Sequence, residues 1–149
     1  MRLRIVAFAV PIALLCGGCV GSSRTAADYQ HKVHATAQAV KGQVALVRLV
    51  LQADRGKGTF ENYASVSISE ASDDAGSMEN AFATVQPPNE AADALRSELL
   101  SLLSDTTDAL DHARTLARRG QAGRIDASML ADLESKLGKF LDEHPVSPL

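Results

Sequence analysis

The chain has 149 residues, of which 46% are hydrophobic, only 4% are aromatic and none is tryptophan. This length suits one domain, and a core built mainly from alanine and leucine favours closely packed helices over a β-sandwich. Residues 1–18 hold two of the 15 basic residues and none of the 18 acidic ones, which leaves 13 basic residues in the rest of the chain. The part of the chain after residue 18 therefore has 18 acidic residues and only 13 basic ones. This excess of negative charge argues against a nucleic-acid-binding protein and against a polybasic membrane-binding surface.

The N-terminus has the layout of an export signal. Two arginines precede an uncharged apolar run over residues 5–15, and two glycines and Cys19 follow it. The run is about half of the ~20 residues that a membrane-spanning helix needs. We therefore expect residues 1–18 to be a signal segment and residues 19–25 to be a tether.

A cysteine directly after small residues at the end of such a signal resembles the lipobox of bacterial lipoproteins. Cys16 stands where lipoboxes usually carry Leu, and Leu15 lies one position earlier. The resemblance covers residues 1–23. It implies that Cys19 becomes the first residue of the mature protein, carries acyl chains such as palmitate and holds the protein at the outer face of the cell membrane. The alternatives are secretion as a soluble protein and an uncleaved anchor.

Two heptad patterns, with apolar residues at alternating steps of four and three, predict the first two helices. The first helix is expected over residues 26–54, with its buried seam at Val33, Ala37, Val40, Val44, Val47 and Leu51, widened by Tyr29, Leu46 and Val50. The second is expected over residues 59–85, with its seam at Ala64, Ile68, Ala71, Ala75, Met78, Phe82 and Val85. Residues 63–69 also alternate with period two, as a strand would. The helix is favoured because the heptad continues beyond them.

The third helix, expected over residues 91–119, has the most sustained pattern. Its predicted seam is Leu95, Leu99, Leu102, Thr106, Ala109, Ala113 and Leu116, widened by Leu103, Leu110 and Ala117. Asn89 is expected to cap its start and Gly120 to end it. We accordingly expect a charge at Leu102 to unfold the protein. After a loop at residues 121–124, the fourth helix is expected over residues 126–144, with its seam at Leu130, Leu133, Leu137 and Phe140.

Four amphipathic helices joined by short connections predict an all-α fold, an up-down-up-down antiparallel four-helix bundle over residues 26–144 with a tail at 145–149. Residues 61–93 contain seven acidic residues and no Lys or Arg. Basic residues recur every seven positions on one flank of the first helix, at Lys41, Arg48 and Arg55. We expect this flank to lie near Asp73 and Asp74 of the second helix.

The sequence contains no nucleophile elbow, phosphate-binding loop or dinucleotide fingerprint, so we expect no enzymatic activity and no cofactor. Histidines on facing helices can bind metals in bundles, and the weak candidates are His31, His34 and His112. No Glu-x-x-His motif accompanies them and they lie beside the predicted seams, so we expect no metal site.

The composition after residue 23, together with the lipobox, is similar to that of small lipoproteins of actinobacterial type. The leading hypothesis is a membrane-anchored helical module of the bacterial cell envelope that binds a partner protein. The alternatives are a bundle that binds a small ligand or a metal, and a purely structural envelope component.

Overall fold

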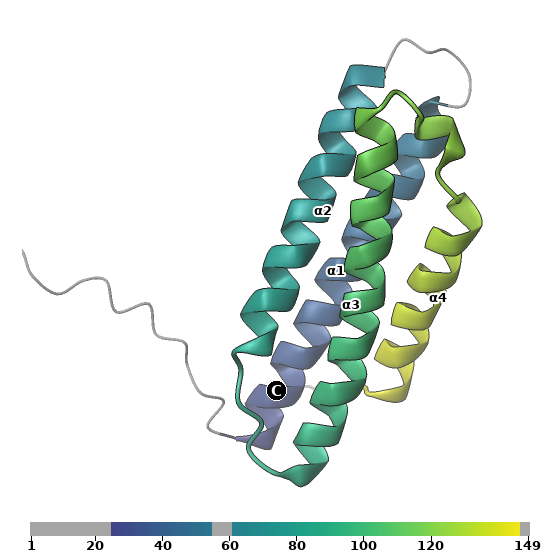
Figure 1. Cartoon of the computed structure of the whole chain (residues 1–149). Coiled ribbons are helices and arrows are strands. Elements are labelled where there is room, and N and C mark those ends of the chain that lie inside the picture. Colours follow the sequence, from purple (N-terminus) through teal and green to yellow (C-terminus); the bar gives the residue numbers. More distant parts are fainter. Residues whose placement is uncertain (1–24, 55–60, 147–149) are drawn as a thin grey trace, which may run out of the picture.

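The computed structural model describes residues 25–54 and 61–146, which form four long helices that pack side by side (Figure 1). The helices are α1 (Ala26–Asp54), α2 (Glu61–Ala83), α3 (Glu90–Arg118) and α4 (Ala127–Glu143), and the short 3-10 helix η1 (Ala122–Arg124) precedes α4. The predicted all-α four-helix bundle is therefore confirmed, with helix bounds within about two residues of those expected. Residues 63–69 are helical within α2.

Contacts between α1 and α2 show that these neighbours run in opposite directions. Near the start of α1, the ring of Tyr29 lies 6.2 Å from that of Phe82 in α2. Further along α1, the Gln43 side-chain amide donates a hydrogen bond to Asp74 at 3.3 Å. Residue numbers thus rise along α1 as they fall along α2, and Figure 1 places the end of α1 and the start of α2 at the same end of the bundle.

The ends of the last two helices follow local sequence signals. The Asn89 side chain caps α3 by accepting a hydrogen bond of 2.9 Å from the backbone N–H of Ala92. Gly120, which follows α3, has a φ of 66°, a left-handed conformation that glycine adopts without steric cost. Asp126 caps α4 and accepts hydrogen bonds at its carboxylate. These bonds lower the pKa of the carboxyl below its usual value, and the bond from the Ser128 hydroxyl has the largest effect.

The predicted loop at residues 121–124 contains an additional element, η1, which packs against α3 and α2. Ala122 within it and Ile125 after it are buried, with exposed fractions of 7% and 8%. The loop therefore closes one end of the core. The heptads do not predict this closure, because neither residue belongs to one.

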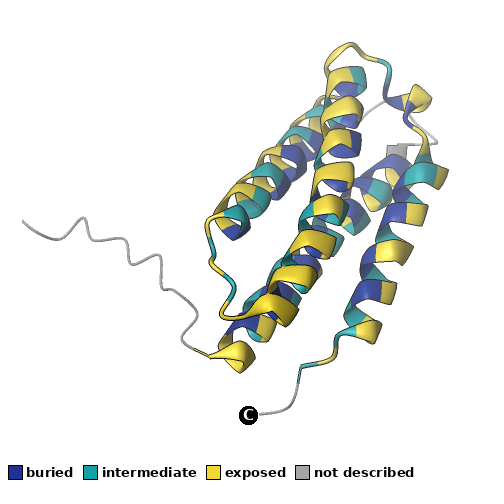
Figure 2. Ribbon diagram, turned by 60° about the horizontal axis from the view of Figure 1, so that its bottom comes forward, coloured by how far each residue is buried: buried dark blue, intermediate teal, exposed yellow. Residues whose placement is uncertain are grey.

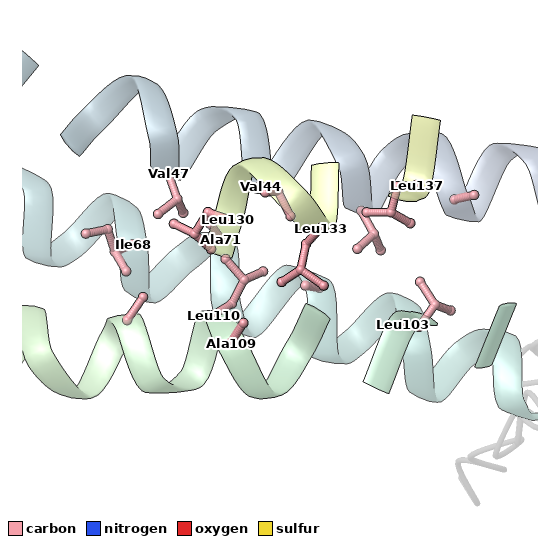
Figure 3. Packing of buried hydrophobic residues seen from close by; sticks show 14 of the residues in the cluster. Val44, Val47, Ile68, Ala71, Leu103, Ala109, Leu110, Leu130, Leu133 and Leu137 are labelled. Carbon is pink, nitrogen blue, oxygen red and sulfur yellow. The ribbon is translucent and has the colours of Figure 1, made fainter. Parts of the chain in front are cut away.

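The core lies along the inner faces of the four helices (Figure 2), and side chains from all four meet between the ribbons (Figure 3). The predicted seams of α1 and α4 are buried as expected. The predicted seam of the second helix is also buried, except that Met78 on α2 and Val85, two residues beyond the end of α2, are half-buried and pack against the edge of the core. One prediction for α1 is wrong: Leu46 is 40% exposed. Leu46 follows Gln43 by about one turn. The side chain of Gln43 already lies at the edge of the contact with α2, so Leu46 lies outside that contact.

The buried stripe of α3 is rotated from the predicted one. Four residues of the predicted seam are buried as expected: Leu99, Thr106, Ala109 and Ala113. The other three, Leu95, Leu102 and Leu116, are only half-buried, whereas Leu103 and Leu110, expected at its side, are completely buried. The reason is that α3 packs closely against α2 and only loosely against α4. The apolar stripe of α3 therefore turns away from α4, and Leu102 lines a surface groove between α3 and α4.

The predicted charge pairing between the first two helices is also wrong. Arg48 of α1 forms an ion pair with Glu134 of α4, and the Lys41 ammonium group lies over Gly138 of the same helix. The basic flank of α1 thus faces α4, while Arg55 lies outside the described residues. On α2, Asp73 pairs instead with Arg114 of α3.

A polar network at the contact between α2 and α3 takes the place of that predicted pairing. Arg114 bridges Asp73 and Asp111, the second through a contact of 3.2 Å. Asp111 also accepts a hydrogen bond from the hydroxyl of Ser72, which is only 2% exposed. Buried polar groups are tolerated in a core when they are hydrogen-bonded, and this network satisfies the Ser72 hydroxyl.

Tyr29 is completely buried, and its hydroxyl has no hydrogen-bond partner among the described residues. Burial raises the pKa of this hydroxyl above its ordinary value of 10.0, although the nearby Arg96 acts in the opposite direction. A raised pKa means that the folded protein holds the proton more tightly than the unfolded chain does. The resulting contribution to stability is complete below pH 10.0 and is lost as the pH rises through the folded-state pKa.

We expect Tyr29→Phe to leave the free energy of unfolding at neutral pH unchanged or to raise it, because it removes a buried hydroxyl that has no partner. Urea unfolding at about pH 8 and about pH 11 should show a smaller alkaline loss of stability in the variant than in the wild type. Tyr63→Phe is the matched control, since that ring is 64% exposed. An equal alkaline loss in wild type and Tyr29→Phe would exclude Tyr29 as its source.

Candidate interaction surface

The predicted lipidation site, Cys19, and the neighbouring Cys16 lie outside the described residues. Lipidation therefore stays a prediction from the sequence. Among the helices of residues 25–54 and 61–146, none is long and apolar enough to cross a membrane.

The three candidate metal ligands lie at different places in the bundle. His31 and His34 are half-buried near the start of α1, and His112 is exposed in the second half of α3. Arg96 of α3 lies within electrostatic reach of Tyr29, so the start of α1 is level with the start of α3. His112 follows Arg96 by 16 residues, which is roughly 25 Å along a helix. The described residues contain no group of three or more His, Cys, Asp and Glu side chains that could hold a metal ion.

Thr106 is the polar residue on the predicted seam of α3. It is completely buried, but its hydroxyl donates a hydrogen bond of 2.7 Å to the backbone carbonyl of Leu102 in its own helix. The side chain is therefore satisfied locally and needs no ligand to compensate its burial.

Grooves occur at the surface between neighbouring helices. Two of them, of about 460 and 440 Å³, flank α4 and are lined largely by charged side chains. A third, of about 330 Å³, lies between α1 and α2 and is mainly apolar; its lining consists of Lys32, Ala35, Thr36, Ala39, Met78, Ala81, Phe82 and Val85. We refer to this third space as the α1–α2 groove.

Four large hydrophobic residues are exposed in the described part of the chain, and all four lie near one end of the bundle. Leu46 and Leu49 on α1 are 40% and 62% exposed, and Tyr63 and Val66 on α2 are 64% and 55% exposed. Because α1 and α2 pack side by side in opposite directions, the last third of α1 lies beside the start of α2. We call these four residues the apolar patch.

The groove and the patch are connected along a single stripe of α1. Six uncharged residues follow each other at steps of four and three on its outer side, and all six are exposed: Ala35, Ala39, Gly42, Leu46, Leu49 and Ala53. We call them the outer seam of α1. The sequence contains this second heptad, but a prediction of one buried stripe for each helix does not include it.

Acidic side chains accompany this surface on α2. Glu70 and Asp74 follow Tyr63 by seven and eleven positions, which places them on the same stripe of the helix, and both are exposed. Asp74 accepts the hydrogen bond from Gln43, whereas Glu70 has no ion pair or hydrogen bond to any described residue. The surface thus combines an apolar stripe on α1 with a negative flank on α2.

Comparison with protein-family models, with curated proteins and with solved structures finds no match to this chain. The function proposed below therefore rests on the chain's own residues.

Proposed function

We propose that the protein is a non-enzymatic helical module of the bacterial cell envelope, anchored at the outer face of the membrane through Cys19, which binds a partner protein through the apolar patch. The observation that carries this proposal is the exposure of Leu46, Leu49, Tyr63 and Val66 together. Exposed apolar residues that gather in one place mark interaction sites more often than isolated ones do. These side chains are 40–64% exposed, so burying the rest of each contributes less than the ~1.5–3 kcal/mol of a fully exposed apolar side chain.

The position of the patch relative to the anchor supports a protein partner. α1 begins seven residues after Cys19, so the tether reaches the bundle at the start of this helix. Leu46 lies 20 residues further along, about 30 Å from that end. The negative flank at Glu70 and Asp74 also disfavours contact with anionic lipid headgroups. A surface at the remote end of a tethered bundle suits another protein better than the membrane itself.

Site-specific photocrosslinking in cells that make the full chain tests this function. With p-benzoylphenylalanine in place of Leu49, we expect a discrete crosslinked product whose partner mass spectrometry identifies as one envelope protein. The control replaces Ser104, an exposed polar residue on α3, and should give no such product. Absence of a product at Leu49, or the same set of products at both positions, would rule out partner binding through the patch.

A further inference from the structure

The partner's binding element can be named more closely, on the assumption that the proposed function holds. We infer that the partner supplies an amphipathic helix with basic residues on one flank, which docks between α1 and α2 along the outer seam of α1. Three features of the surface carry this inference: the spacing of the seam, the groove beside it and the charge of its α2 side.

The spacing of the outer seam is that of a helix–helix contact. Steps of four and three keep six uncharged residues on one stripe from Ala35 to Ala53, a length of about 27 Å along the helix. At Gly42 an added Cβ atom would meet no atom within 4 Å, so the residue is not small to make room for a neighbour within the bundle. Small residues in a seam allow the backbone of a second helix to approach closely. Leu46 and Leu49 provide larger side chains, which can pack into the spaces between the side chains of that second helix.

The groove offers a helix a second wall. Beside Ala35 and Ala39, it is lined on the α2 side by the apolar residues Met78, Ala81, Phe82 and Val85. Ala81 belongs to the same helical stripe as Glu70 and Asp74, so the α2 wall continues from the apolar groove to the negative flank. A helix laid in this position would contact α1 and α2 together, as ridges pack into the grooves of neighbouring helices.

The charge of the surface indicates which side chains the partner helix carries on the flank that faces α2. The described part of α2 has acidic side chains and no Lys or Arg, and Glu70 has no ion pair or hydrogen bond with residues 25–54 or 61–146. A helix that carries Lys or Arg on the side facing α2 would complement Glu70 and Asp74. In a second copy of this chain, the cations on the flank of the outer seam are already engaged with its own α4, because Arg48 pairs with Glu134 and the Lys41 ammonium group lies over Gly138. The charges therefore favour a different protein over a homodimer through this face.

Two synthetic helical peptides of three heptads serve as probes. They share the same Ala and Leu seam and carry either lysine or glutamate at every flanking position. Fluorescence anisotropy with the full mature chain should show that the lysine peptide binds about tenfold or more tightly than the glutamate peptide. The reasons are the weak charge pairs with Glu70 and Asp74 and the repulsion between these two acids and the glutamate peptide. Leu49→Glu should weaken binding of the lysine peptide by about tenfold or more.

Charge reversal on the protein provides the decisive comparison. Glu70→Lys combined with Asp74→Lys should invert the preference so that the glutamate peptide binds more tightly. Asp108→Lys is the matched control, because it changes an exposed acid on α3 and should leave the preference as in the wild type. Circular dichroism verifies that these variants, which are substituted at exposed positions, remain folded.

The outcomes separate this inference from the proposed function. Equal binding of both peptides, or the same effect from Asp108→Lys as from reversal at Glu70 and Asp74, would overturn the basic-helix inference. If Leu49 nevertheless crosslinks to one envelope protein, partner binding would stand without it. Crosslinking at Leu49 to a second copy of the chain would replace the inferred partner with a homodimer. Absence of any product at Leu49 would remove both.

Discussion

Leu103→Asp is expected to abolish cooperative folding, whereas Leu102→Asp should leave a folded bundle of lower stability. Leu103 is completely buried, and its replacement removes a core side chain at a cost of about 2–5 kcal/mol. The carboxylate would in addition be buried without a partner or be forced to keep its proton. The sum approaches the whole stability of a typical domain, about 5–15 kcal/mol. At Leu102 the carboxylate would reach water through the groove between α3 and α4.

Circular dichroism at increasing urea concentration measures this difference. The Leu102→Asp variant is the matched control, because the two substitutions have the same chemistry and stand at adjacent positions of the same helix. Full helicity and a cooperative transition in Leu103→Asp, together with an unfolded Leu102→Asp, would place the buried stripe of α3 where the heptad alone predicts it.

Cys19→Ser is expected to release the protein from the membrane fraction. A serine cannot carry thioether-linked or thioester-linked lipid, because it lacks the sulfur atom that both linkages require. Each buried methylene group of an acyl chain contributes about 0.8 kcal/mol to membrane binding, so loss of the acyl chains removes the binding free energy that they supply. Cys16→Leu is the matched control, because it places the usual lipobox residue three positions before Cys19 and should preserve lipidation.

Fractionation of cells labelled with a palmitate analogue, followed by mass spectrometry, measures the result. The wild type and Cys16→Leu should be labelled and membrane-bound, with a mature mass that begins at Cys19 plus acyl chains. Cys19→Ser should be unlabelled. An unlabelled wild-type chain that begins beyond Cys19 would show secretion by an ordinary signal peptidase instead. An unlabelled wild-type chain that retains residues 1–18 would show an uncleaved anchor.

Local patterns in the sequence determined the number, bounds and caps of the helices. Asn89 and Gly120 act through contacts within one or two turns, so their roles could be predicted without knowledge of the neighbours. The seam of α4 was likewise predicted in full, because Leu130 and Leu137 belong to a single narrow apolar stripe with no competing one. The apolar patch was less accessible, since α1 carries two heptads and periodicity does not tell which of them faces the core.

Only the tertiary structure decided which side of each helix meets which neighbour. The heptad of α1 predicts a buried stripe with two flanks, but the same pattern fits a bundle in which Lys41 and Arg48 face α2 and one in which they face α4. The structure selects α4, through Arg48 and Glu134. For the same reason Leu102 and Leu103 exchange their expected roles on α3. A repeat along one helix indicates how much of the surface of that helix is buried. The order of the helices around the core depends instead on contacts between residues far apart in the chain.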